Sequence, residues 1–103
     1  MTESEFTELA DVVFARIEQV LDASDADIEY SLNGPVLELE FADGSQIIIN
    51  RHGPNKEIWL AAKSGGFHYA YLDGQWMSRR DSSELFGKLE ELVKTGCGEA
   101  VKF

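Results

Sequence analysis

Residues 27–51, DIEYSLNGPVLELEFADGSQIIINR, decide the fold of this chain. Apolar and polar side chains alternate along the stretch with a period of two, which indicates strands that bury one face. Asn33-Gly34 and Asp43-Gly44 interrupt the alternation, and both dipeptides are typical of the tight turns that join antiparallel strands. The stretch therefore predicts three consecutive strands of an antiparallel meander.

The same alternation continues toward the C-terminus in three further segments, 57–63 (EIWLAAK), 67–73 (FHYAYLD) and 75–79 (QWMSR). Residues that favour turns stand before each of them: Gly53-Pro54, Gly65-Gly66 and Asp73-Gly74. We therefore expect a sheet of five or six antiparallel strands, each joined to the next by a short turn.

Two helical patterns flank the predicted sheet. Residues 4–22 repeat apolar side chains every three or four positions, and Thr2 and Glu5 have the spacing of a capping box at their start. Residues 82–95 show the same period. One amphipathic helix is thus predicted before the strands along the sequence, and a second one after them.

The second predicted helix has its own boundary signals. Asp81 is the expected N-cap, with Glu84 three residues on, and Gly96 is expected to end the helix. Val101 and Phe103, in the tail that follows, are expected to pack back onto the body of the protein.

A helix, an antiparallel sheet and a second helix predict an α+β fold, a two-layer α/β sandwich. We expect both helices to cover one face of the sheet, while the other face contacts water. A chain of 103 residues with 44% hydrophobic residues is enough for a single domain, residues 1–103, with one modest core.

The net charge of the chain limits the classes of partner that it could bind. Nineteen acidic and nine basic residues give a net charge of −10, which argues against binding to nucleic acid or to an anionic membrane. No apolar run is long enough to cross a bilayer, the N-terminus is acidic, and Cys97 is the only cysteine. We therefore expect a cytoplasmic protein whose partners are cations or a basic protein.

Seven carboxylates are predicted to form one exposed strip, here named the acidic ridge. On a helix with 100° per residue, four of them fall within an arc of roughly 80° opposite the apolar stripe, and three continue onto the first strand. The members of the acidic ridge are Glu8, Asp11, Glu18, Asp22, Asp25, Asp27 and Glu29.

The acidic ridge allows two interpretations. It could be an ordinary solvated helix face that happens to be acidic. However, Glu18 and Asp22 are like charges at i and i+4, and only Arg16 could offset any of the repulsion. The alternative is a surface that binds a basic protein or hard cations, weakly and with sensitivity to salt, because no histidine or cysteine stands beside these carboxylates.

The sheet face that no helix covers is the second candidate surface. If Ile58 and Leu60 point toward the helices, Trp59 points outward, beside Ile48 and Asn50 of the preceding strand. An exposed tryptophan next to apolar neighbours favours a protein-binding surface, with Arg51, Lys56, Arg79 and Arg80 expected at its rim. The alternative is a register shifted by one residue, which would place Trp59 in the core.

Nothing in the sequence favours catalysis. His52 and His68 appear isolated, without a serine or cysteine at the spacing of a known motif, and no phosphate-binding glycine loop is present. We therefore expect a protein that is not an enzyme.

Together these residues resemble the frataxin family, in its bacterial branch. The resemblance covers nearly the whole chain. It rests on an acidic first helix that leads into an acidic strand, on GSQIIINR, Pro54 and IWLAAKSGGFHY, on the later Trp76 and on a closing amphipathic helix. The sequence departs from the usual family pattern at Gln19, where a second acid is common, and at His52 and Glu57, where glutamine is frequent.

The resemblance implies the same helix–sheet–helix sandwich and a role in iron–sulfur cluster assembly. It implies weak, exchangeable binding of Fe(II) and Fe(III) by the acidic ridge, and docking of that ridge on the cysteine desulfurase, with the scaffold protein as a further partner. Trp59, Asn50 and Arg51 would form a second contact surface.

Three functional hypotheses follow. The first is an iron-binding regulator of cluster assembly or iron donor, monomeric without metal. The second is a ferroxidase or iron-storage oligomer, which would need carboxylates and histidines that hold two irons close together. The third is an adaptor in which the acidic ridge serves only protein docking and metal binding is incidental.

Overall fold

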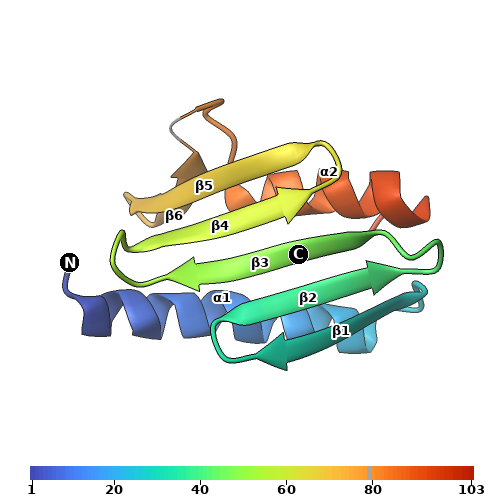
Figure 1. Ribbon diagram of the computed structural model, residues 1–103, viewed down its shortest axis with the longest axis horizontal. Helices are drawn as coiled ribbons and strands as arrows, with labels where there is room; N and C mark the ends of the chain where they lie inside the picture. The colour runs from blue at the N-terminus through green and yellow to red at the C-terminus, as the bar shows by residue number, and fades with distance from the viewer. Residues whose placement is uncertain (79) are drawn as a thin grey trace.

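The computed structural model describes residues 1–78 and 80–103, and in this part of the chain two helices lie on one face of a six-stranded antiparallel sheet (Figure 1). The predicted α+β sandwich is therefore confirmed, with six strands rather than five. Arg79, predicted at the rim of the exposed face, lies outside the described residues.

The sheet is a simple meander in which each strand pairs with the next along the chain. Its order is β1-β2-β3-β4-β5-β6, and seen face-on in Figure 1 the helix α1 lies behind the β1 side and α2 behind the β5 side. The strands are β1 (Ile28–Asn33), β2 (Val36–Phe41), β3 (Gln46–His52), β4 (Glu57–Ala62), β5 (Gly65–Leu72) and β6 (Gln75–Ser78).

The turns follow the prediction except at two positions. Asn33 pairs with Val36 as the last residue of β1, so the loop predicted at Asn33-Gly34 consists of Gly34 and Pro35. Asp73 and Gly74 form a two-residue loop with φ values of 49° and 83°, a conformation that favours glycine and asparagine-like residues. The predicted turn at Gly65-Gly66 is wrong, because Ala62 pairs with Gly65 and Ala61 with Gly66. Lys63 and Ser64 make that turn instead, so the glycines begin β5.

The helix α1 (Glu3–Ala23) begins with the predicted capping box. The Thr2 hydroxyl accepts a hydrogen bond from the backbone N–H of Glu5, and the Glu5 carboxylate accepts one from the backbone N–H of Thr2. One stripe of the helix is buried against the sheet: Phe6, Ala10, Val13, Phe14, Ile17 and Leu21. The opposite stripe, which contains the acidic residues, is left to water.

The helix α2 (Leu85–Cys97) starts three residues later than predicted. Asp81 is not its N-cap, because the Asp81 carboxylate accepts hydrogen bonds from the backbone N–H and the hydroxyl of Ser83 in the preceding turn. Glu84 is the N-cap, and its carboxylate accepts the backbone N–H groups of Phe86 and Gly87.

The end of α2 also differs from the prediction. Gly96 lies inside the helix, against the ring of Phe41, and the C-cap is Gly98 in the left-handed conformation with φ 78°. The tail then packs back as predicted, since Val101 and Phe103 are both buried.

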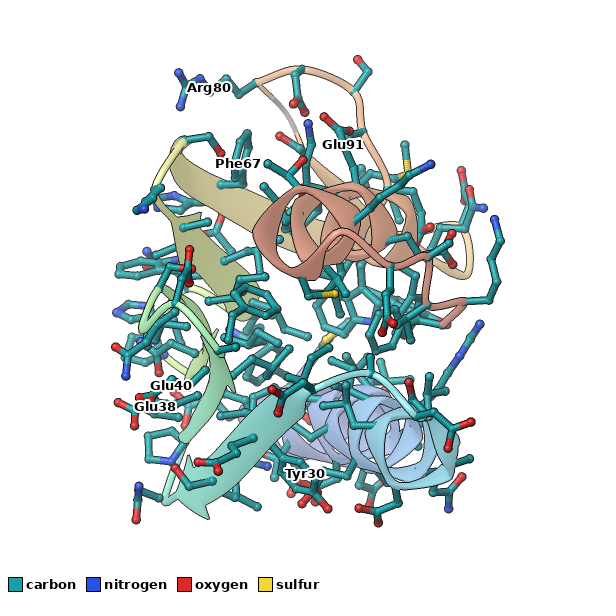
Figure 2. All side chains as sticks on the ribbon, turned by 90° about the vertical axis from the view of Figure 1, so that its right-hand side faces the viewer. Tyr30, Glu38, Glu40, Phe67, Arg80 and Glu91 are labelled. Atoms are coloured by element: carbon teal, nitrogen blue, oxygen red, sulfur yellow. The ribbon has the colours of Figure 1, made fainter. Side chains whose placement is uncertain are left out.

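The core fills the space between the helices and one face of the sheet (Figure 2). Residues from α1, from the inward side of all strands after β1, from α2 and from the tail form one apolar cluster. Within the described residues, neither helix is both long enough and apolar enough to cross a membrane. The sandwich leaves two surfaces for function, the outer side of α1 and the sheet face that the helices do not cover.

Candidate metal-binding ridge and outer sheet face

The members of the acidic ridge lie on the outer side of α1, in the segment that leads into β1 and on β1 itself. Glu8, Asp11 and Asp22 are exposed on α1, and Glu18 is half-buried between them. The ridge then continues through the loop after α1, where Asp25 and Asp27 are exposed, onto the edge strand β1, where Glu29 is exposed. The placement predicted from the helical period is therefore confirmed for the four residues of α1. Of the three predicted on the first strand only Glu29 is in β1, because the strand begins at Ile28 and Asp25 and Asp27 precede it.

Two of these carboxylates interact with side chains of the sheet, one through an ion pair and one through a hydrogen bond. Asp11 forms an ion pair with the guanidinium of Arg51, which also lies 5.1 Å from the centroid of the Phe14 ring. Asp22 accepts a hydrogen bond of 2.6 Å from the Tyr30 hydroxyl, and this bond raises the pKa of Tyr30 to about 12. In the described part of the chain, no ion pair involves the other ridge carboxylates.

The ridge does not converge on one preformed cage. Among the described residues, no group of three or more histidine, cysteine, aspartate or glutamate side chains could hold a metal ion together. A cation on this surface would contact one or two carboxylates at a time and keep water on its remaining positions, the mode that hard cations accept.

The acidic surface extends further than sequence reasoning indicated. Glu29 pairs directly with Glu40 across β1 and β2, and Ser31 pairs with Glu38. Figure 2 shows Glu38 and Glu40 on the sheet side that faces away from the helices. The alternation in VLELEF had already placed both glutamates outward, but only the strand register shows that they join Glu29. Adjacent like charges on paired strands repel, so this corner of the sheet also attracts cations.

A second group of acids lies just before β1, in the segment between α1 and that strand. Asp25 and Asp27 line a pocket of about 290 Å³ together with Asp43 and Cys97. Asp43 follows β2 and Cys97 ends α2, so the fold unites three segments that are distant in the sequence. Neither Asp43 nor Cys97 was a predicted site residue, because no local pattern connects them with the ridge.

Trp59 lies on the outer face of the sheet, as predicted. Its neighbours in β4, Ile58 and Leu60, are 0% and 1% exposed, whereas the Trp59 side chain is half-buried on the opposite side. Asn50 pairs with Trp59, and Ile48 pairs with Ala61 on the same face. The alternative register, which would have placed Trp59 in the core, is therefore excluded.

The two histidines are not isolated, and that interpretation was wrong. The imidazoles of His52 and His68 stack on opposite sides of the Trp59 indole, with centroid distances of 4.1 and 4.5 Å and interplanar angles of 9° and 12°. The Glu57 carboxylate accepts a hydrogen bond of 3.0 Å from the indole N–H. Sequence reasoning missed the cluster because its members come from three strands and meet only through their register.

The predicted cationic rim is only partly on this face. Arg51 pairs with the inward-facing Ile58 and reaches Asp11 on α1, so it does not share a face with Trp59. Lys56 is in the turn between β3 and β4, where its φ is 51°. Arg80 donates a hydrogen bond of 3.1 Å to the Gly66 carbonyl oxygen. Partner contacts of these side chains remain predictions.

Comparison with known proteins agrees with this architecture. The model of the frataxin-like domain matches residues 1–99. The iron-sulfur cluster assembly protein CyaY of Neisseria meningitidis serogroup A is 46% identical over 99% of this chain and 95% of its own length. The protein of the same name from Dechloromonas aromatica is 49% identical over 98% of this chain and 97% of its own length.

Solved structures share the fold. Frataxin from Psychromonas ingrahamii superposes with a TM-score of 0.95 at 37% identity, over 99% of this chain and 97% of the other. Trimeric frataxin from Saccharomyces cerevisiae, complexed with ferrous iron, superposes with a TM-score of 0.71 at 31% identity, over 92% and 87% of the two chains. With a family model that spans almost all of its length, and with this agreement in sequence and fold, the chain belongs to the frataxin-like family.

Proposed function

We propose that this chain is a non-enzymatic iron-binding protein of cytoplasmic iron–sulfur cluster assembly. The acidic ridge binds Fe(II) and Fe(III) weakly and exchangeably, and it docks on a basic surface of the cysteine desulfurase. The outer sheet face around Trp59 contacts the assembly machinery, including the scaffold protein. The relatives named as cluster assembly proteins and the yeast frataxin complexed with ferrous iron support this proposal.

The observation that carries the proposal is the acidic ridge itself. Seven exposed or half-exposed carboxylates line up over α1 and β1, and within the described residues Asp11 alone among them forms an ion pair. Such a strip raises the local concentration of cations and steers a basic partner. It offers carboxylate oxygens as ligands, and no group of three or more ligand side chains converges among the described residues, which suits weak binding of iron.

Anaerobic titration with Fe(II) tests the metal-binding role. A variant with three neutralised ridge acids should bind Fe(II) several-fold more weakly than the unmodified protein: Asp22→Asn, Asp25→Asn and Asp27→Asn. A control with the same charge change away from the ridge should bind as the unmodified protein does: Glu3→Gln, Asp73→Asn and Glu91→Gln. Equal loss in both variants would show that net charge matters and that the ridge is not the site.

Docking is tested by capture on immobilised cysteine desulfurase, with and without Fe(II). Reversal of one ridge charge, Asp22→Lys, and Trp59→Arg should each reduce capture. If the metal-free and metal-loaded proteins are captured equally well, the adaptor hypothesis replaces the iron-dependent one. The oligomeric state is checked by light scattering, where we expect a monomer in the absence of metal.

The ferroxidase hypothesis remains the enzymatic alternative. It requires two irons held close together by shared side chains, and no group of three or more suitable ligands occurs among the described residues. Dioxygen uptake in the presence of Fe(II) measures it directly. Uptake above the rate in buffer, abolished by neutralising the ridge, would favour that alternative over the proposal.

A further inference from the structure

The only two histidines of the chain stack on the same side chain. His52 of β3 and His68 of β5 are 16 residues apart in the sequence, but their rings lie on opposite sides of Trp59 of β4. Imidazole is the side chain whose charge ordinarily changes between pH 5 and 8. All the imidazole of this protein is therefore concentrated around one half-buried indole on the outer sheet face.

The two imidazoles have different surroundings. The Nδ1 atom of His52 is buried and has no hydrogen-bond partner in the described residues. The His68 side chain is 58% exposed, and its Nδ1 lies 4.0 Å from the Glu57 carboxylate. A second proton on His52 would therefore place an N–H group in a buried position without an acceptor, whereas a charge on His68 has both water and a carboxylate nearby.

Few other charges of residues 1–78 and 80–103 face this cluster. Glu57, which pairs with His52 across β3 and β4, holds the indole N–H with its carboxylate. Arg80 lines, with Glu57 and His68, a pocket of about 340 Å³. On the β2 side Val36 pairs with Asn50, so that strand contributes no charge next to His52. Among the residues that the structure describes, the remaining cation close in sequence is Lys56, which precedes Glu57 in the turn.

We propose that the His52–Trp59–His68 stack makes docking of the outer sheet face dependent on pH. In the neutral form the stack is an uncharged aromatic surface that a partner pocket can cover. Protonation adds up to two positive charges that docking would have to remove from water, so affinity falls on acidification. The inference rests on the proposed use of this face for docking, and it adds that the face docks best while the imidazoles are neutral.

The size of the effect follows from proton linkage. Docking that excludes a proton loses affinity as the pH falls, by a factor that grows with the number of protons excluded. We expect a loss of more than about threefold between pH 7.5 and 5.5, and a larger one if both imidazoles must be neutral. A loss of less than about threefold would contradict the proposal.

The first test needs no partner. The indole N–H resonance of Trp59 in a ¹⁵N-labelled sample is followed from pH 5 to 8, in the unmodified protein and in a His52→Gln, His68→Gln variant. We expect a titration with its midpoint in this range that disappears in the variant. Trp76 serves as internal reference, because its ring packs against Phe6 and Tyr71 and contacts neither histidine. A Trp59 resonance that does not move, or that moves equally in the variant, would overturn the proposal.

The second test measures binding to the desulfurase–scaffold complex at pH 7.5 and 5.5. Any change in the affinity of the His52→Gln, His68→Gln variant between the two pH values reports the pH dependence of the partners. The unmodified protein should lose more affinity at pH 5.5 than this variant does. If Trp59→Arg leaves binding unchanged at both pH values, the outer face is not a docking surface and the proposed function fails there. If Trp59→Arg abolishes binding but the glutamine variant loses affinity as the unmodified protein does, only the proton-sensing proposal fails.

Discussion

Two substitutions that each remove one negative charge from the acidic ridge should change stability in opposite directions. Glu18→Gln is expected to stabilise the protein, because Glu18 stands one helical turn before Asp22 and the two like charges repel. Asp11→Asn is expected to destabilise it, because Asp11 forms the ion pair with Arg51 that joins α1 to β3. A purely global charge effect would make both variants more stable.

The structure sets the magnitudes. Relief of one like-charge pair at i and i+4 contributes about 0.2–0.5 kcal/mol. The Asp11 side chain is 60% exposed and that of Arg51 22%, so their pair contributes about 0.2–1 kcal/mol after solvent screening. The two variants should thus differ by about 1 kcal/mol, or by about 4–8 °C in melting temperature for a domain of this size.

Urea and thermal unfolding, followed by circular dichroism in about 20 mM and about 500 mM salt, provide the measurement. Both effects should shrink at high salt, because the charges involved are near the surface. Both variants should also bind Fe(II) more weakly if the ridge holds iron, so a gain in stability would accompany a loss of binding in Glu18→Gln. A shift of the same sign in both variants, or shifts that ignore salt, would refute this account of the ridge.

Two further predictions concern α2 and the turn that precedes it. Gly96→Ala should destabilise the protein by about 1–2 kcal/mol in urea unfolding, because the new methyl group would overlap the Phe41 ring and the usual benefit of alanine in a helix offsets only part of this. Gly87→Ala is the control in the same helix, where the nearest atom is 3.7 Å away, and it should be neutral or stabilise by up to about 1 kcal/mol; equal destabilisation of both would contradict the packing argument. Hydrogen bonds from Ser83, first from its hydroxyl, lower the pKa of Asp81 to about 2, below its ordinary value of 3.8. The stabilisation from Asp81 should therefore be complete above about pH 4 and be lost as the pH falls toward 2, and the acid limb of a stability–pH profile should flatten in Asp81→Asn.

Most of the fold could be predicted from local patterns. Period-two alternation placed every strand, and the dipeptides Asp43-Gly44 and Asp73-Gly74 marked two of the turns. The errors were also local, because more than one residue in the same stretch has the chemistry of a turn or of an N-cap. Gly65-Gly66 resembles a turn, but the register pairs both glycines with β4, and Asp81 resembles an N-cap, but its carboxylate is already used by Ser83.

The candidate site likewise has one part that local patterns predict and another that only contacts between elements create. The acidic ridge was predictable, because a helix places residues at fixed angles and the neighbouring strand continues its exposed side. The Asp11–Arg51 ion pair, the meeting of Glu29 with Glu40 and the stack around Trp59 were not predictable. Each of them joins residues from different elements.

Periodicity, capping and turn chemistry depend on a few consecutive residues, and these were enough to determine which segments are helices or strands and which side of each is apolar. Contacts between elements depend on how strands align and on where the helices rest against the sheet. Those alignments minimise the free energy of the whole core rather than of any one segment. The packed fold alone therefore decided that both histidines flank one indole, and that Arg51 serves the ridge instead of the outer face.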